Sequence, residues 1–319
     1  MNKYRKMKHR VQEYLIYRRS LGFLLHIEGK ELLKFADYVD GKNYRGALTE
    51  DIAIEWAKLS KKASRLTWAR RLEVVRCFAK YCCITEPDTQ IPEKRIFGKS
   101  RHRQPPYIFS KFEVQQILDT TKYLIPENGL RPISFRYLFC LLYATGLRIS
   151  EALNLSPEDV DLEKGLLKIR QTKFNKSRLV PLHKSTIKAL SDYCNQRKKY
   201  LPSSKLRAFF IIDDGQTITL RAAEYAFLRI RNLLGWDSRS QGKLPRIYDL
   251  RHTFVCHRLL SWYEQGVDVH KVIPHLSAYL GHVKVSDTYW YITGIPELMK
   301  ITSERFESYA NNYYEGDQL

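Results

Sequence analysis

The stretch RYLFCLLYATGLRISEALNL, residues 136–155, decides the fold of the second half of the chain. Its first ten residues are mostly apolar, which predicts a helix that is buried on most of its surface. Gly146 comes next and predicts a turn, because glycine is favoured where the chain leaves a helix with a positive φ. Apolar residues return at helical spacing beyond the turn, so a second helix is expected after the glycine.

Shorter patterns elsewhere add a small sheet to a mainly helical chain. Residues 166–182, LLKIRQTKFNKSRLVPL, alternate in polarity and turn at 174–177, which predicts a two-stranded hairpin. Residues 208–213, AFFIID, predict another short strand. Residues 109–121 predict a helix that Ser110 caps. The expected fold class is therefore mainly α with a small β-sheet.

Charge narrows the class of partner. The 319 residues carry a formal net charge of +20, and the pI is about 9.6. Residues 1–107 hold 24 Lys and Arg against 12 Asp and Glu, so the first third is the most basic part of the chain. A protein this basic most often binds a polyanion, usually nucleic acid. The first third is the stronger candidate for gripping phosphates.

Composition also limits the compartment. No apolar run approaches the ~20 residues of a membrane span, and the basic N-terminus lacks the apolar core of a signal peptide. The six cysteines form no C-x-x-C pair, and several lie in apolar runs, which predicts small buried side chains rather than disulfides or a zinc site. We expect a cytoplasmic protein that does not enter a membrane.

The first third has helical patterns of its own. In KELLKFADYV, residues 30–39, apolar side chains recur on one helical face, and the spacing returns over 66–83. Between these segments, LTEDIAIEWAKLS predicts a helix that starts near Thr49. The polar side of the 66–83 helix carries four candidates for DNA contacts: Arg70, Arg71, Arg76 and Lys80.

A change in composition marks a linker. Residues 86–106 contain four prolines, little periodicity and a run of basic residues that includes Arg101 and Arg103. Such a segment predicts an extended linker that can follow a phosphate backbone. The expected division is a helical domain over 1–88, a basic linker over 89–107 and a second domain over 108–319.

Two tyrosines close the informative part of the second domain, in LGHVKVSDTYWYIT, residues 280–293. Ser286 or Asp287 can cap a helix that carries both of them. Tyr289 and Tyr291 are then separated by about 200° of rotation, so they face opposite sides of that helix. Only one of the two can face a given site.

Four blocks in the second domain resemble those of the tyrosine recombinases, also called the phage integrase family, which includes Xer-type and transposon-encoded enzymes. The blocks are ATGLRISEAL, TKFNKSRLVPL, LRHTF, and LGH with a tyrosine nine residues after its histidine. The resemblance implies a helical core-binding domain followed by a mixed α/β catalytic domain. It also implies five catalytic residues: Arg148, Lys173, Arg251, His282 and the nucleophile Tyr291.

These residue types suit the cleavage of a phosphodiester, which gains negative charge in the transition state. Arg148 and Arg251 can clamp the non-bridging oxygens, and His282 can donate a further hydrogen bond. The resemblance implies that Tyr291 attacks to form a 3′-phosphotyrosyl bond, while Lys173 protonates the leaving 5′-oxygen. No metal, ATP or other cofactor is expected, because the sequence has no P-loop and no convincing acidic metal cluster.

Three positions need separate comment. Tyr248 stands where the family has His or Lys in its H-x-x-R box; it can donate to a phosphate but is a poor base near neutral pH, and it is counted among the candidate catalytic residues. His252 follows Arg251, but one step along a helix turns it about 100° away, so it is not assigned to the site. Lys176 shares a turn with Lys173 and is the alternative acid.

The leading hypothesis is a site-specific DNA recombinase that integrates, excises or transposes a mobile element. Two alternatives stay open: a non-catalytic DNA-binding accessory protein or decayed recombinase, and a type IB topoisomerase. The resemblance implies double-stranded DNA as partner and a homotetramer on DNA, with partner recombinases or DNA-bending factors as further candidates. The tail after Tyr291 is long enough for one more helix, which in the family docks on a neighbouring subunit. Residues 219–234 add three basic candidates for DNA contacts: Arg221, Arg229 and Arg231.

Overall fold

The computed structural model describes residues 5–59, 63–100, 106–170, 177–201, 207–236 and 244–293. The chain divides into two compact units, Met1–Gln104 and Pro105–Leu319. Some predictions fall outside the described residues: those for Lys173, Lys176, Arg101, Arg103 and the tail after residue 293.

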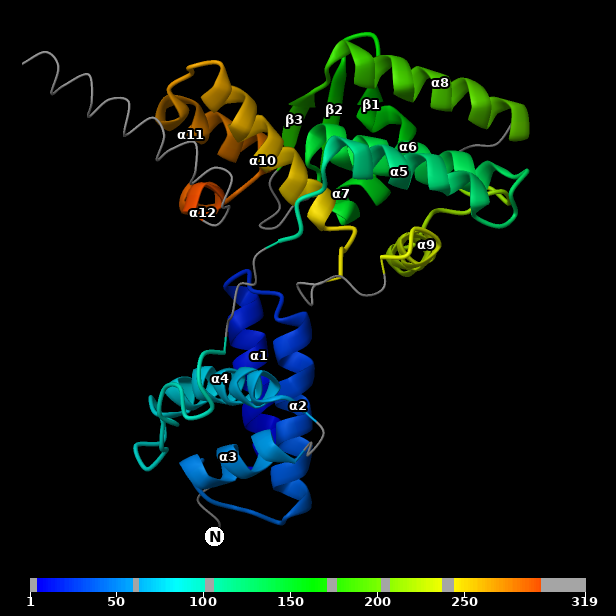
Figure 1. The fold of residues 1–319 in the computed structure, drawn as a ribbon. Helices are drawn as coiled ribbons and strands as arrows, with labels where there is room; N and C mark the ends of the chain where they lie inside the picture. The colour runs from blue at the N-terminus through cyan, green and yellow to red at the C-terminus, as the bar shows by residue number, and fades with distance from the viewer. Residues whose placement is uncertain are drawn as a thin grey trace, which may run out of the picture. The chain divides into compact units, whose positions relative to one another are not determined.

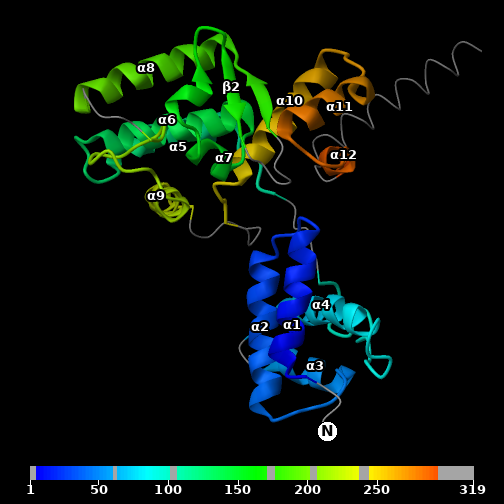
Figure 2. The same ribbon diagram turned by 180° about the vertical axis from the view of Figure 1, so that it is seen from behind.

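Four helices form the described part of the first unit: α1 (Met7–Ser20), α2 (His26–Gly41), α3 (Glu50–Lys58) and α4 (Arg65–Cys82). α1 and α2 lie side by side, and α4 packs against α1, α2 and α3 (Figures 1 and 2). The predicted helix start at Thr49 is confirmed, because its side chain accepts a hydrogen bond from the Ile52 amide.

α1 is not among the helices predicted from the sequence, in which this segment stands out only as basic. Met7, Val11, Tyr14 and Leu15 follow helical spacing and are buried in the core around Phe35. Lysines and arginines between them dominate the composition of the segment. The role of these apolar residues is therefore clear only in the structure, where the other three helices cover them.

Residues 89–100, which belong to the predicted linker, pack against the first unit. The Gln90 amide donates to the Leu48 carbonyl at 2.8 Å, and the Pro92 carbonyl accepts from Arg76 at 3.2 Å. Arg76 is only 9% exposed, so the expectation that it lies on an exposed basic face is wrong. The domain boundaries after residues 88 and 107 stay a prediction.

Eight α-helices form most of the described part of the second unit: α5 (Lys111–Thr120), α6 (Leu130–Thr145), α7 (Ile149–Leu153), α8 (Lys184–Tyr200), α9 (Leu220–Leu233), α10 (Asp249–Glu264), α11 (Val269–Leu280) and α12 (Ser286–Thr293). Shorter elements complete it: the 3₁₀ helices η1 (Thr121–Tyr123) and η2 (Pro157–Asp159), and the strands β1 (Val160–Asp161), β2 (Leu166–Ile169) and β3 (Arg178–Pro181). The predicted fold class, mainly α with a small β-sheet, is confirmed. Among the helices described, none is long and apolar enough to cross a membrane.

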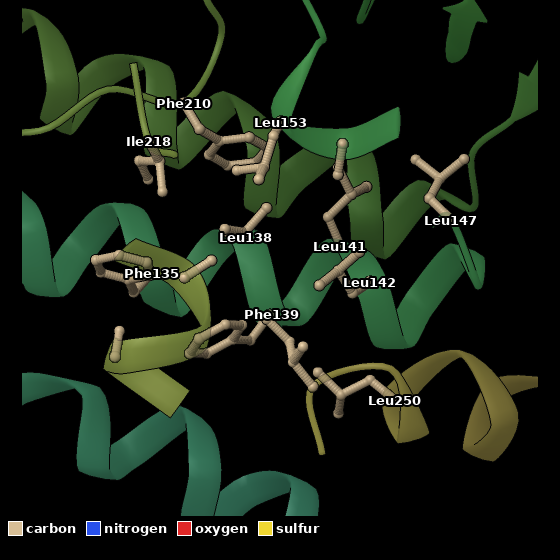
Figure 3. Packing of buried hydrophobic residues seen from close by; sticks show 14 of the residues in the cluster. Phe135, Leu138, Phe139, Leu141, Leu142, Leu147, Leu153, Phe210, Ile218 and Leu250 are labelled. Carbon is tan, nitrogen blue, oxygen red and sulfur yellow. The ribbon is translucent and has the colours of Figure 1, made fainter. Parts of the chain in front are cut away.

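α6 is the central element of the second unit, as its apolar run predicts. It contacts α5, α8 and α10. Phe135, Leu138, Phe139 and Leu142 are all buried along it (Figure 3). Burying one side chain of this kind is worth about 1.5–3 kcal/mol, so α6 contributes a large share of the stability of this core. Gly146 ends the helix in the left-handed conformation, with φ of +63°.

The three strands form an antiparallel sheet in the order β1-β2-β3. The predicted hairpin is confirmed by the pairing of β2 with β3, in which Leu167 lies opposite Val180. Both side chains are buried, so one face of the hairpin joins the core next to α6. The turn of the hairpin lies outside the described residues.

The predicted strand at 208–213 is wrong. The segment makes an isolated bridge between Ile211 and Thr217 instead of a strand. Part of its backbone is engaged elsewhere, because the Phe209 amide donates to the Leu155 carbonyl at 2.7 Å. The apolar run reflects burial in the core rather than pairing in a sheet.

α10, α11 and α12 build a further buried cluster in the second unit. Phe254, Leu259, Ile273 and Tyr291 all belong to this cluster. α12 covers the segment in which the sequence predicts a helix with two tyrosines. The cluster therefore brings the last described helix against the helix that begins with Asp249.

Gly146→Ala is expected to destabilise the second unit more than Gly266→Ala does. Both glycines have positive φ, +63° and +74°, which costs an alanine about 1–2 kcal/mol. A Cβ at Gly146 would also lie 2.4 Å from Phe254 Cδ1, whereas a Cβ at Gly266 meets no atom within 4 Å. Overpacking should add about 1–3 kcal/mol at Gly146 alone. Hydrogen exchange of the α6 and α10 amides measures both losses, and equal losses would contradict the packing argument.

Candidate active site

Arg251 lies at the centre of the candidate site and is 1% exposed. Its Nη1 donates to the Gly146 carbonyl at 2.6 Å, and its Nη2 donates to the Leu280 carbonyl at 2.9 Å. Nη2 also lies 3.0 Å from Nε2 of His282. One buried guanidinium on α10 therefore joins the turn after α6 to the end of α11 and holds His282 beside them.

Arg148 reaches the same place from the N-terminus of α7. Its Nη2 donates to the Gly281 carbonyl at 3.2 Å, and its Nη1 donates to Glu151 Oε1 at 2.8 Å. Glu151 also accepts from Nη1 and Nη2 of Arg178 on β3, at 3.0 and 2.8 Å. The carboxylate is buried, while the Arg148 side chain keeps 29% of its surface exposed. Glu151 thus fixes the direction of Arg148 without covering it.

The electrostatics of this cluster favour an anion. Burial by itself raises the pKa of Glu151, but hydrogen bonds from Arg178 and from the backbone and side chain of Arg148 outweigh it and lower that pKa to about 2. Burial and the nearby charge of Arg148 lower the pKa of Arg251, although a guanidinium stays charged at neutral pH. Three guanidiniums and one carboxylate leave a net positive charge. In the described residues, no group of three or more His, Cys, Asp or Glu side chains is placed to hold a metal ion.

His282 is oriented from both ring nitrogens. Its Nδ1 lies 2.7 Å from Oγ1 of Thr288, which is fully buried on α12. Because Arg251 can only donate, Nε2 of His282 accepts from it, and Nδ1 carries the proton toward Thr288. Gly281 precedes the histidine with φ of +66°, and a Cβ there would lie 2.7 Å from Nη1 of Arg178.

The two tyrosines of α12 face opposite ways, as the helical rotation predicts. Tyr289 is 36% exposed, whereas Tyr291 is 1% exposed. The Tyr291 hydroxyl lies 2.7 Å from Nδ1 of His252 on α10. The structure thus brings His252, which the sequence gives no reason to assign as a substitute for Tyr248, into contact with the candidate nucleophile. His252 does turn away from Arg251, but α12 packs against α10 and brings Tyr291 to it.

Tyr248 lies immediately before α10 and is 40% exposed. Its ring is edge-on to that of His252, with 4.9 Å between the ring centroids. Tyr248 and Tyr291 are both close enough to influence the pKa of Arg251. The structure thus brings together five of the six predicted catalytic residues: Arg148, Tyr248, Arg251, His282 and Tyr291. Their catalytic roles stay predictions.

The segment that holds the candidate site also matches a known protein family. Residues 108–295, more than half of the sequence, match the phage integrase family. The chain belongs to this family. Its members are tyrosine recombinases, which cleave and rejoin DNA.

Two relatives show how far the similarity of this chain extends. A protein of Sinorhizobium fredii (strain NBRC 101917 / NGR234), with the provisional name integrase/recombinase y4rB, is 37% identical over 301 residues, which cover 93% of this chain and 96% of that protein. Tyrosine recombinase XerC of Chlamydia caviae (strain ATCC VR-813 / DSM 19441 / 03DC25 / GPIC) is 28% identical over 246 residues, covering 77% and 73% of the two chains.

Solved structures share the fold of this chain. XerH recombinase bound to a palindromic difH substrate, in a post-cleavage complex, aligns with a TM-score of 0.65 at 20% identity, covering 92% of this chain and 84% of XerH. The Tn1549 transposon integrase in complex with transposon right end DNA aligns with a TM-score of 0.68 at 15% identity, covering 94% and 99%.

The basic residues predicted on one face of α4 differ in exposure and in their partners. Arg70 and Lys80 are exposed, and Nε of Arg70 donates to the Ser100 carbonyl at 3.3 Å. Arg71 instead pairs with Glu31 at 3.3 Å. Exposed side chains on this face are therefore available to a phosphate backbone, whereas Arg71 first has to leave its carboxylate. Contact with DNA stays a prediction for all of them.

The other basic residues that are predicted to contact DNA lie on α9. Arg221 is exposed, whereas Arg229 and Arg231 are half-buried. Nη1 of Arg231 donates to the Pro245 carbonyl at 3.3 Å, which ties the helix to the segment before α10. Arg221 is the best placed of the three for a surface contact.

Three residues of the site are not among the sequence-based predictions: Arg178, His252 and Thr288. Arg178 follows directly on the hairpin turn, and only its place in the block TKFNKSRLVPL points to it. Thr288 is three residues before Tyr291, a spacing that puts both on neighbouring positions of a helix. His252 has no signal that sequence alone can use, because its role depends on where α12 packs.

Glu151→Gln should lower the stability of the second unit at pH 7. A pKa of about 2, against about 4.3 for an unperturbed glutamate, corresponds to roughly 3 kcal/mol. A carboxylate with a depressed folded pKa stabilises fully above its unfolded pKa, and the contribution is lost as pH falls through the folded pKa. Urea unfolding at pH 7 and pH 3 should therefore show a smaller difference at pH 3. The exposed Glu163→Gln serves as control, and a loss independent of pH would contradict the assignment.

Proposed function

We propose that this protein is a site-specific DNA recombinase that cuts and rejoins strands through a 3′-phosphotyrosyl bond to Tyr291. The grouping of Tyr291 with His282 and two guanidiniums, Arg148 and Arg251, carries the proposal. A protein that only binds DNA has no need of a buried tyrosine hydroxyl beside a cluster of this charge. The family membership supports the same reading.

The proposed chemistry exchanges one phosphodiester for another. The Tyr291 oxygen attacks the scissile phosphorus, a new P–O bond forms to the tyrosine, and the bond to the 5′-oxygen breaks. The 5′-oxygen takes a proton, for which the family resemblance nominates Lys173. Attack by a 5′-hydroxyl on the phosphotyrosine reverses these steps, and a hydroxyl from another duplex completes strand exchange. No external energy source is required, because the bond energy is retained in the covalent link.

The arginines can stabilise the charge that develops on the phosphate. Arg148 is the more exposed of the two, so a phosphate reaches it without unfolding the site. Arg251 is held by carbonyl groups, and its Nε has no hydrogen-bond acceptor among the residues described. A preorganised pair of guanidiniums is the arrangement that favours a phosphoryl transition state. His282 would add a donor once its proton is on Nε2.

The proposed substrate is double-stranded DNA. The net charge of +20 supports this, and the similar recombinases XerH and Tn1549 integrase are solved with their DNA. Reciprocal exchange between two duplexes requires four strands to be cut, so the proposal includes a homotetramer on DNA. The proposed compartment is the cytoplasm. Relatives that carry the names integrase and transposon integrase favour integration, excision or transposition of a mobile element.

A DNA-binding accessory protein derived from a recombinase is the second candidate. Tyr248 favours it, because a tyrosine is a poor base near neutral pH where the family pattern has His or Lys. The two candidates differ in one observable product, the covalent protein–DNA adduct.

Tyr291→Phe should abolish an SDS-resistant adduct that the wild-type protein forms. Nicked duplexes tiled from the DNA that flanks the gene are the probes, since mobile elements often carry their sites nearby. Tyr289→Phe is the matched control: it removes a hydroxyl from the same helix on the opposite face, and it should leave the adduct in place. The measurement is adduct yield on SDS gels.

Other outcomes separate the alternatives. An adduct that survives Tyr291→Phe but is lost in Tyr289→Phe would show that Tyr289, and not Tyr291, is the nucleophile. Tight binding without adduct from any tile would favour the accessory protein. An adduct accompanied by relaxation of supercoiled DNA, without strand exchange between duplexes, would indicate a type IB topoisomerase.

Binding of the Tyr291→Phe protein to duplex DNA should weaken steeply with salt. If six to ten phosphates are neutralised, affinity is expected to fall roughly 10³- to 10⁵-fold between about 50 and 200 mM salt. Fluorescence anisotropy with a labelled duplex measures the slope. A nearly flat dependence would contradict a basic surface that follows the phosphate backbone.

A further inference from the structure

His252 is the group that the structure places directly on the proposed nucleophile. Its Nδ1 lies 2.7 Å from the Tyr291 hydroxyl, and the histidine is 7% exposed. The two rings belong to α10 and α12, whose apolar side chains share one buried cluster. The contact is therefore supported by helix packing on both sides, which limits how far either ring can move.

Tyr248 is less suited to take the proton of Tyr291. It occupies the position where the family pattern has His or Lys, yet a free tyrosine has a pKa near 10, which makes it a poor base near neutral pH. Tyr248 is also 40% exposed, and its ring meets the ring of His252 edge-on. A free imidazole has a pKa of about 6.5, close to physiological pH, as an effective general base requires.

We propose that His252 is a catalytic residue that accepts the proton of Tyr291 during DNA cleavage, a step that rests on the proposed function. As the tyrosine oxygen bonds to phosphorus, its proton moves to Nδ1, and the bond to the 5′-oxygen breaks; this oxygen takes a proton from the general acid, which by the family resemblance is Lys173. In rejoining, the imidazolium returns the proton to the tyrosine oxygen. His252 thus accepts the proton that the His or Lys at the position of Tyr248 would accept in the family pattern.

The surroundings of His252 are consistent with this task. Arg251, the neighbouring residue on α10, donates to the carbonyls of Gly146 and Leu280 and is close enough to Tyr291 for the two to interact electrostatically. The ring of His252 lies edge-on to that of Tyr248, which precedes α10, and is tilted against that of Tyr291 on α12. A distance of 2.7 Å permits direct proton transfer without an intervening water.

His252→Asn tests the assignment. An asparagine places a hydrogen-bonding group near the position of Nδ1 but does not accept a proton at neutral pH. On the nicked duplex that the wild type cleaves, the initial rate of adduct formation at pH 7 should fall about 10²-fold or more. His270→Asn, an exposed histidine on α11, is the matched control and should keep the wild-type rate. DNA affinity should stay within about threefold for both, as expected of changes that remove no phosphate contact.

Two readouts separate proton transfer from positioning. Raising the pH ionises the tyrosine without a base, so the deficit of His252→Asn should shrink between about pH 7 and 9. A 5′-bridging phosphorothiolate, whose sulfur leaves without protonation, should rescue Lys173→Ala but not His252→Asn. A deficit that is constant with pH, or one that the phosphorothiolate rescues, would overturn the assignment.

The outcomes also separate this inference from the proposed function. A wild-type adduct together with a His252→Asn rate within threefold of wild type overturns the role of His252 alone. A larger deficit in Tyr248→Phe than in His252→Asn overturns it too, in favour of Tyr248 as the acceptor. Absence of a wild-type adduct on every duplex contradicts the proposed function, and the role of His252 falls with it.

Discussion

The buried guanidinium of Arg251 is the constraint on which the rest of the site depends. The group is 1% exposed, and two carbonyls and one imidazole nitrogen accept hydrogen bonds from its terminal nitrogens, which offsets much of the cost of burying the charge. Those carbonyls belong to Gly146 and Leu280, which lie far apart in the sequence. Satisfying one side chain therefore dictates where the turn after α6, the end of α11 and His282 meet.

The turns that supply these carbonyls need glycine for a physical reason. Gly146 and Gly281 both adopt the left-handed conformation at the end of a helix, and in each case a Cβ would collide with a neighbouring side chain. Close approach allows Arg148 to reach the Gly281 carbonyl while Glu151 holds its other side. Stability and function are thus served by the same contacts, because the network that satisfies the arginines also aims them.

α12 contributes to the site with one side of a short helix. Thr288 holds the ring of His282, and Tyr291, three residues later, meets His252. The opposite side carries the more exposed Tyr289. A single packing arrangement of α12 against α10 and α11 therefore sets the orientation of one histidine and the surroundings of the candidate nucleophile.

The amino-acid sequence by itself determined the local elements and the family. Periodicity predicted α4, α6 and the β2–β3 hairpin, and the order of short blocks predicted the recombinase fold. Helical rotation separated Tyr289 from Tyr291, because that relation is internal to one helix. Relations between elements were decided only by the tertiary structure. Packing buried Arg76, drew 208–213 into the core without a strand, and placed His252 on Tyr291, since each depends on which distant segment covers a given face.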